Sequence, residues 1–204
     1  MIEIILLVIL SYLCGSIPFG LILTKIFNKK DIRKIGSGNI GATNVLRTGN
    51  KLLALTTLLF DILKGFLPVL ISKQYFPEFI YLCSLFAFFG HIFPIWLKFR
   101  GGKGVATFLG ILFGLSYSLA FLFIFTWIVV FLIFKFSSVS SIFATMTVFV
   151  ITFIKDTALK SINQNFVVED NLKLILFIFF ILILFTHKKN ISNLKNKTEQ
   201  KIKL

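Results

Sequence analysis

The stretch Gly104–Phe134, GVATFLGILFGLSYSLAFLFIFTWIVVFLIF, contains 31 residues without a charged side chain. As a single α-helix rising 1.5 Å per residue it would be about 46 Å long, which exceeds the hydrocarbon core of a bilayer, roughly 30 Å thick. The triplet Ser116-Tyr117-Ser118 offers a polar break near the middle of the stretch. We therefore predict two helices here, over 104–117 and 118–134.

The rest of the chain is similarly apolar. Hydrophobic residues make up 57% of the 204 positions, the mean hydropathy is +0.93 and there are 27 Phe, which is more apolar surface than a soluble domain usually buries. The first apolar run opens with Met1-Ile2-Glu3 and shows no clear small-residue cleavage site, so we expect it to be a transmembrane helix and not a signal peptide. The pattern predicts an all-α integral membrane protein, with further helices over 2–24, 51–72, 78–93, 138–155 and 171–186.

Basic residues gather in three segments, and their positions predict the topology. Lys25–Lys51 carries seven basic residues and one acid, Lys98–Lys103 carries three, and the tail from Lys188 carries six. Lys and Arg in short loops mark the cytoplasmic side, and splitting the chain at Ser116–Ser118 places all three segments there. We therefore expect one transmembrane domain over 1–204 with seven crossings, in preference to five or six, an outside N-terminus and a cytoplasmic C-terminus. Its cytoplasmic parts are then the active-site loops 25–50, 94–104 and 135–141 and the basic tail 187–204.

The net charge of +14 would indicate a nucleic-acid partner in a soluble protein, but here the charge lies in short loops between apolar runs. We expect a phosphate-bearing lipid or metabolite as the partner, and no nucleic acid. Cys14 and Cys83 lie inside apolar runs without a second Cys or His at metal-ligand spacing. They are interpreted as small buried side chains, and no metal site or cofactor is expected.

The first cytoplasmic segment contains Gly36–Arg47, GSGNIGATNVLR. Its three glycines let the backbone turn and approach a ligand closely, while hydroxyl and amide side chains add hydrogen-bond donors. Arg47 supplies a planar guanidinium that suits phosphate. The pattern indicates an anion cradle, although a solvated loop of turn residues has a similar composition.

The second cytoplasmic segment contains Gly90–Gly104, GHIFPIWLKFRGGKG, directly before a predicted helix. Adjacent glycines at a helix start expose N–H groups where the helix dipole favours an anion, and Lys103 adds a full charge. The spacing of a Walker loop is absent, so nucleotide hydrolysis is not supported. A plain connecting loop is the alternative interpretation.

Three further groups of polar residues interrupt the apolar pattern. Ser137–Ser141 lies at a predicted helix start, where serines most often cap the backbone. His187–Asn190 opens the basic tail, and its histidine can hold a proton or an anion near neutral pH. Asp61 and Lys64 stand three apart on a predicted membrane helix, so they share a face and are expected to pair inside the bundle.

In their order along the chain, these segments resemble the bacterial acyl-phosphate:glycerol-3-phosphate acyltransferases of membrane phospholipid synthesis. The resemblance runs from Gly15-Ser16-Ile17-Pro18 to Glu199, and Lys135-Phe136-Ser137 departs from the usual Arg-Tyr-Val type of sequence. It rests on five motifs: Gly36–Arg47, Asp61-x-x-Lys64-Gly65, His91–Thr107, Ser138-x-x-Ser141 and His187-x-x-Asn190.

The resemblance implies transfer of a fatty acyl group from acyl phosphate to the 1-hydroxyl of glycerol 3-phosphate in the bacterial cytoplasmic (inner) membrane. It gives catalytic roles to Ser37, Arg47, Lys103, His187 and Asn190. It assigns substrate binding to Gly38, Asn39, Thr43, Asn44, Gly101, Gly102, Gly104, Ser138 and Ser141. Structural support is expected from Asp61, Lys64, His91 and Glu199. Since acyl phosphate is already activated, we expect direct transfer without an acyl-enzyme, and no acyl-thioester carrier; association with the enzyme that makes acyl phosphate is a further expectation.

Two other classes of function fit parts of the pattern. A small transporter or channel for an anionic metabolite would use the basic loops as an entrance, but such a protein is expected to bind near the membrane midplane. A membrane scaffold leaves the cytoplasmic motifs unexplained. The thioester-dependent acyltransferases need a His-x₄-Asp pair, which is missing because Trp96 and Ser192 stand at that spacing from the two histidines.

Overall fold

The computed structural model describes residues 2–28, 31–162 and 170–202, and within these ranges it contains ten α-helices, three short 3₁₀ helices and no strand. The all-α fold class is therefore confirmed. The chain divides into two compact units, Met1–Ser116 (unit 1) and Tyr117–Leu204 (unit 2). Each unit is described by itself.

The first apolar run of unit 1 is a broken helix. The helix α1 covers Ile2–Ser16 and α2 covers Phe19–Asn28, with a bend of 40° between them. The prediction of one continuous helix over 2–24 is wrong at Ile17-Pro18, because proline has no backbone N–H and its ring clashes with the preceding turn. At the break, the Ile17 carbonyl accepts a hydrogen bond from the side chain of Lys64, whose Nζ lies 2.7 Å away.

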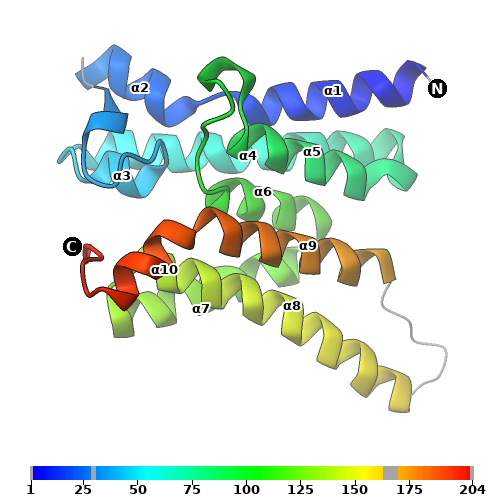
Figure 1. The fold of residues 1–204 in the computed structure, drawn as a ribbon. Helices are drawn as coiled ribbons and strands as arrows, with labels where there is room; N and C mark the ends of the chain where they lie inside the picture. Colours follow the sequence, from blue (N-terminus) through cyan, green and yellow to red (C-terminus); the bar gives the residue numbers. More distant parts are fainter. Residues whose placement is uncertain (1, 29–30, 163–169, 203–204) are drawn as a thin grey trace. The chain divides into compact units, whose positions relative to one another are not determined.

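Four more α-helices belong to unit 1: α3 (Ala42–Leu46), α4 (Lys51–Tyr75), α5 (Ile80–Ile92) and α6 (Val105–Leu115). The 3₁₀ helices η1 (Ile32–Lys34), η2 (Pro77–Phe79) and η3 (Ile95–Leu97) lie between them. Figure 1 shows α1 beside α5 and α4 beside α6. These pairs approach closely because glycines stand at the contacts: a Cβ on Gly15 would overlap the Ala87 carbonyl, and one on Gly65 would overlap the Thr107 carbonyl.

Unit 2 contains α7 (Tyr117–Phe134), α8 (Ser137–Ile162), α9 (Asp170–Thr186) and α10 (Lys188–Lys195). The helix α8 packs against both α7 and α9 within this unit. Lys173 Nζ joins α9 to α8 through an ion pair of 2.6 Å with Asp156 Oδ2, and it pairs with Asp170 at the same distance. The rings of Phe149 and Phe180 stack with centroids 6.3 Å apart, which adds apolar contact between the same two helices.

The length and the apolar composition of the helices indicate a membrane protein. Four helices among the described residues are long and apolar enough to cross a membrane, or six if each of the bent pairs α1–α2 and α9–α10 is one crossing. On α7, Phe121, Phe125 and Leu132 are more than half exposed, which suits a surface that faces lipid. The predicted break at Ser116 is confirmed, since α6 ends at Leu115 and α7 begins at Tyr117. The count of seven crossings stays a prediction, because the 11 residues of α6 form a shorter apolar helix.

Candidate active site

The first glycine-rich loop, Gly36–Arg47, is organised by one buried side-chain amide. Asn44 is 2% exposed. Its Oδ1 accepts the Ser37 N–H at 3.1 Å. Its Nδ2 donates to the carbonyl oxygens of Ile32, Ile35 and Asn39 at 2.8–3.1 Å. Because buried polar groups are costly when unpaired, these four bonds fix the path of the loop around Asn44.

The turn at Gly36 brings the loop's cation to the same amide. Gly36 has φ 55°, and a Cβ there would lie 2.5 Å from Asn44 Oδ1 and 2.8 Å from Arg47 Cδ. Arg47 Nη1 lies 3.5 Å from Asn44 Oδ1, the outer limit of a hydrogen bond. The Arg47 guanidinium therefore lies beside the turn that presents Ser37.

The remaining predicted residues of this loop lie on the same turn and on α3. Ser37 and Gly38 are exposed, whereas Asn39 and Thr43 are half-buried. Just before the loop, Asp31 Oδ2 pairs with Arg33 Nη2 at 2.6 Å, and these hydrogen bonds hold the pKa of the Asp31 carboxyl well below its usual range. The loop thus exposes a hydroxyl and backbone groups next to positive charge.

The second glycine-rich loop, Gly101–Gly104, is fastened to the end of α5. The Gly102 N–H donates to the His91 carbonyl and the Gly101 N–H to the Ile92 carbonyl, both at 3.1 Å. These two carbonyls belong to the last turn of α5, where helix carbonyls lack partners within the helix. The amide protons of Gly101 and Gly102 are thus used inside the fold, which leaves Lys103 and the start of α6 to present charge and donors.

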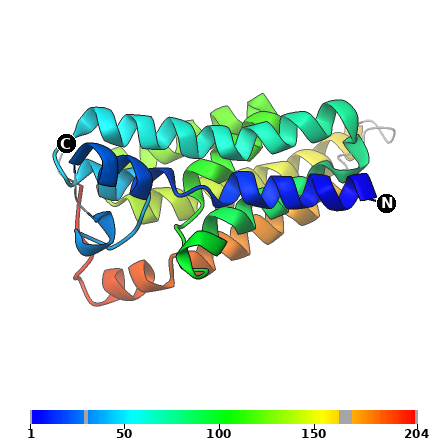
Figure 2. The ribbon, with the colours of Figure 1, turned by 90° about the horizontal axis from the view of Figure 1, so that it is seen from above.

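The backbone between α5 and the second loop is held against the break in the first span. Trp96 Nε1 donates to Ser16 Oγ at 2.8 Å, and Tyr12 OH donates to the Phe93 carbonyl at 2.7 Å. In Figures 1 and 2 the connection between α5 and α6 lies beside the junction of α1 and α2. The segment that leads into the second loop is therefore anchored to α1.

A buried polar cluster lies under the second loop. His91 Nδ1 is 3.0 Å from Thr107 Oγ1 and 3.9 Å from Asp61 Oδ1. Asp61 Oδ1 in turn pairs with Lys64 Nζ at 2.8 Å. All four side chains are at most 4% exposed. The predicted pairing of Asp61 and Lys64 is present in unit 1, and the cluster joins α4, α5 and α6.

Unit 2 holds a second cluster of predicted residues around Glu199. Glu199 Oε1 accepts from Asn190 Nδ2 at 2.6 Å and from Ser138 Oγ at 3.0 Å, and Oε2 accepts from Asn193 Nδ2 at 3.3 Å. Beyond it, the Ile202 N–H donates to the Lys135 carbonyl at 3.1 Å. The segment that follows α10 is thereby tied to the turn between α7 and α8.

Two predicted residues of unit 2 lie beside this cluster, His187 between α9 and α10 and Ser141 on α8. His187 is 1% exposed, and its Nδ1 lies 2.8 Å from the Ile183 carbonyl. Ser141 Oγ donates to the Ser137 carbonyl at 2.8 Å and accepts from Trp127 Nε1 at 3.1 Å. Ser141 thus bonds within α8 and to α7, while Ser138 contacts the tail.

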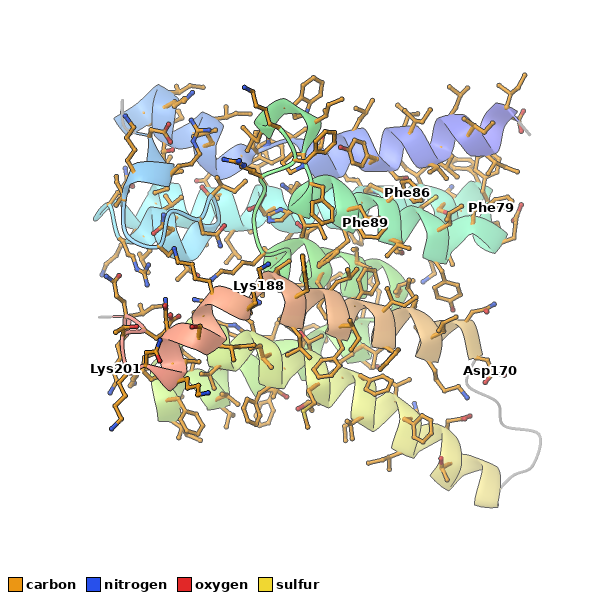
Figure 3. All side chains as sticks on the ribbon, viewed as in Figure 1. Phe79, Phe86, Phe89, Asp170, Lys188 and Lys201 are labelled. Atoms are coloured by element: carbon orange, nitrogen blue, oxygen red, sulfur yellow. The ribbon has the colours of Figure 1, made fainter. Side chains whose placement is uncertain are left out.

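Lysines frame the tail of unit 2. Figure 3 shows Lys188 where α9 gives way to α10 and Lys201 beyond the end of α10. Lys188 Nζ lies 4.9 Å from the centroid of the Phe185 ring, and Lys201 Nζ lies 5.6 Å from that of Phe136. The positive charge expected of the tail is therefore held against aromatic rings on α9 and just before α8.

Sequence reasoning missed Thr107, Tyr12 and Trp96. Thr107 was only the last residue of the block His91–Thr107, yet its hydroxyl is the partner of His91 Nδ1. The sequence offered one signal for this contact: a histidine and a threonine lie on the two predicted helices that flank one short loop. Among the described residues, no three His, Cys, Asp or Glu side chains are grouped so that they suit a metal ion.

Comparison with known proteins gives consistent matches along the chain. A family model described as Glycerol-3-phosphate acyltransferase matches residues 5–197. Proteins of that name from Pelagibacter ubique and Wolbachia pipientis subsp. Culex pipiens are 53% and 46% identical to this chain. The first match covers 99% of each chain and the second 96% of each.

Solved structures give the same match at the level of the fold. The crystal structure of PlsY, an integral membrane glycerol 3-phosphate acyltransferase, superimposes in its glycerol 3-phosphate form with a TM-score of 0.88 and 34% identity. The superposition covers 98% of this chain and 96% of the PlsY chain. The lysophosphatidic acid form of that protein gives a TM-score of 0.85.

Proposed function

The chain belongs to the glycerol-3-phosphate acyltransferase family, and from this premise we propose that it moves a fatty acyl group from acyl phosphate to the 1-hydroxyl of glycerol 3-phosphate. The products are 1-acylglycerol 3-phosphate, a lysophosphatidic acid, and inorganic phosphate, in the first acylation step of phospholipid synthesis. The transporter interpretation is set aside because the matched family is one of enzymes. One observation supports acyl phosphate as the donor. The chain has two separate glycine-rich loops with one cation each, Arg47 and Lys103, and the reaction joins two substrates that each bear a phosphate.

In the first step, the loops hold the phosphates. Arg47 and Ser37 flank the turn at Gly36, so a guanidinium and a hydroxyl can meet one phosphate there. Lys103 stands immediately before Gly104 and the N-terminus of α6, where a cation and a helix start both favour an anion. Gly104 has φ 83°, and it packs over the Phe88 ring where a Cβ would overlap.

His187 supplies an acceptor for the hydroxyl of glycerol 3-phosphate. The Ile183 carbonyl only accepts hydrogen bonds, so the His187 Nδ1 at 2.8 Å from it carries a proton. In the neutral imidazole, Nε2 is then an acceptor. Asn190, held by Glu199, is the proposed partner of the hydroxyl or of the oxyanion that develops during attack.

The transfer is a direct displacement. The 1-hydroxyl oxygen forms a bond to the acyl carbonyl carbon, the bond from that carbon to the phosphate oxygen breaks, and phosphate leaves with the electron pair. The hydroxyl proton passes to the departing phosphate, directly or through His187. Because acyl phosphate is an activated mixed anhydride, positioning of both substrates supplies much of the acceleration.

Initial rates over a grid of both substrates test this route. Intersecting lines are expected, with His187→Ala lowering kcat more than it raises the KM of the donor, and Ser37→Ala raising a KM. Parallel lines, together with labelled acyl chain trapped on Ser37 or another hydroxyl without acceptor, would establish a covalent route instead. Acyl-thioester donors should give no product in the same preparation.

The proposed topology has seven crossings, an outside N-terminus, a cytoplasmic C-terminus and a cytoplasmic active site in the inner membrane. It rests on the distribution of Lys and Arg, and it requires α6 to cross although 11 residues rise only about 16 Å. The predicted connection 155–171 is shorter than expected, since α8 continues to Ile162 and α9 begins at Asp170. Single cysteines at Ser116, at Ser118 and within 155–171, in a background without Cys14 and Cys83, should react with an impermeant reagent from outside. Protection of these sites with labelling of the tail would contradict the topology.

A further inference from the structure

We propose that His91 is a positioning residue that sets the conformation of the Gly101–Gly104 loop. The proposal rests on the function proposed above, in which that loop and Lys103 hold a substrate phosphate. His91 lies on α5 and is 4% exposed, so its imidazole is enclosed by protein. It acts through the loop and through Thr107, and not on the substrate.

Both sides of the imidazole are occupied by this part of the fold. Nδ1 lies 3.0 Å from Thr107 Oγ1 on the first turns of α6. Nε2 lies against Gly102, where an added Cβ would overlap this nitrogen. The ring therefore bridges the end of α5, the loop and the start of α6, and its orientation determines where Gly102 can lie.

The backbone of His91 fixes the same glycine from a second direction. The Gly102 N–H donates to the His91 carbonyl at 3.1 Å, and the neighbouring Gly101 N–H donates to the Ile92 carbonyl. The carbonyl holds the loop close to α5, while the imidazole limits how closely it can approach. A glycine is required at 102 because the imidazole ring occupies the space that a side chain would need. This reason is separate from the close approach of a phosphate to the backbone.

A buried ion pair lies next to the ring. Asp61 Oδ1 lies 3.9 Å from Nδ1, beyond hydrogen-bond distance, and pairs with Lys64 Nζ at 2.8 Å. Lys64 Nζ also donates to the Ile17 carbonyl at the break in the first span. The hydrogen bond that orients the imidazole is therefore the one to Thr107, and the carboxylate is already neutralised by Lys64.

The decisive variants change this one hydrogen bond at nearly constant volume. Thr107→Val keeps the shape of a buried side chain and removes the hydroxyl, whereas Thr107→Ser keeps the hydroxyl. We expect Thr107→Val to raise the KM of glycerol 3-phosphate or of acyl phosphate about 5- to 30-fold, as for a lost buried hydrogen bond. Thr107→Ser should stay within about threefold of the wild type. The exposed Gly49, with φ 87° and open space around it, provides a folding control as Gly49→Asn.

A double-mutant cycle tests the contact between the ring and Gly102. Gly102→Ala in the wild type should raise the same KM about tenfold or more, because the Cβ meets the imidazole. In a His91→Ala background, which has room for the Cβ, adding Gly102→Ala should change that KM by less than about threefold. Equal effects of Gly102→Ala in both backgrounds would overturn the proposal, as would unchanged KM values for folded Thr107→Val.

A separate readout distinguishes failure of this inference from failure of the proposed function. The shift of the thermal unfolding midpoint produced by glycerol 3-phosphate reports loop occupancy without turnover. Wild-type protein that is stabilised by glycerol 3-phosphate but transfers nothing from acyl phosphate would refute the proposed donor alone. In that case a smaller stabilisation of Thr107→Val than of Thr107→Ser still supports the role of His91, and equal stabilisation overturns it.

Discussion

The two glycine-rich loops of unit 1 have similar compositions and are built by different means. In Gly36–Arg47 a side chain inside the loop, the Asn44 amide, gathers the backbone around itself through four hydrogen bonds. In Gly101–Gly104 the fixing groups lie outside the loop, on the last turn of α5. The first loop therefore depends on the Asn44 side chain. The second depends on the lack of a side chain at Gly101 and Gly102, where a Cβ would overlap His91.

The difference predicts how each loop responds to mutation. The first loop should be most sensitive to its own amide, which fixes the turn, while Ile40 and Val45 pack it against Leu21 of α2 and Leu53 of α4. The second should be sensitive to changes on the helices around it, because His91 of α5 and Thr107 of α6 hold its position and the Asp61–Lys64 pair of α4 lies beside His91.

The largest effect is expected from breaking the buried pair under the second loop. Lys64→Met leaves the Asp61 carboxylate buried at 2% exposure without its cation, which should cost about 3–5 kcal/mol of the free energy of unfolding. Combining Lys64→Met with Asp61→Asn removes both charges and should recover most of that loss. Thermal unfolding in detergent measures both variants. A double variant no more stable than the single one would show that the pair's charges are not what the fold depends on.

A smaller effect is expected from Asn44→Asp in the first loop. The change keeps an acceptor for the Ser37 N–H but removes the donor to three carbonyls, so we expect a loss of about 1–3 kcal/mol. A tenfold or greater fall in kcat/KM should accompany it, because the turn beside Arg47 loosens. Asn50→Asp is the matched control, since Asn50 caps α4 as an acceptor and aspartate caps equally well. Equal midpoints for the two variants would contradict the organising role of Asn44.

Much of the fold follows from elementary constraints on the sequence, and the failures have physical causes. The break at Ser116 was predictable because a charge-free stretch of 31 residues is too long for one crossing and contains a polar triplet. The break at Pro18 was missed because the run around it is uninterrupted in hydropathy, and hydropathy does not register a lost N–H. The stabilising group, Lys64, lies 47 residues away in the chain.

The residues of the candidate site show the same limit. Asn44 and Gly102 were assigned to substrate binding because amides and glycines in a basic loop are typical of anion sites. In the structure Asn44 bonds to its own loop, and the Gly102 N–H bonds to α5. A sequence shows which groups can donate, but not which donors the fold itself uses. The same holds for Glu199, whose partners Ser138 and Asn190 come from two different helices.

We propose that the two differently built loops together hold the phosphates of one acyl transfer. The most direct test of this claim is the rate of 1-acylglycerol 3-phosphate formation over a grid of acyl phosphate and glycerol 3-phosphate concentrations, for wild type, Asn44→Asp and Thr107→Val. We predict product from the wild type, and a KM for at least one phosphate substrate raised about fivefold or more in each folded variant. Unchanged KM values in both variants, with only a smaller yield of folded protein, would contradict the claim.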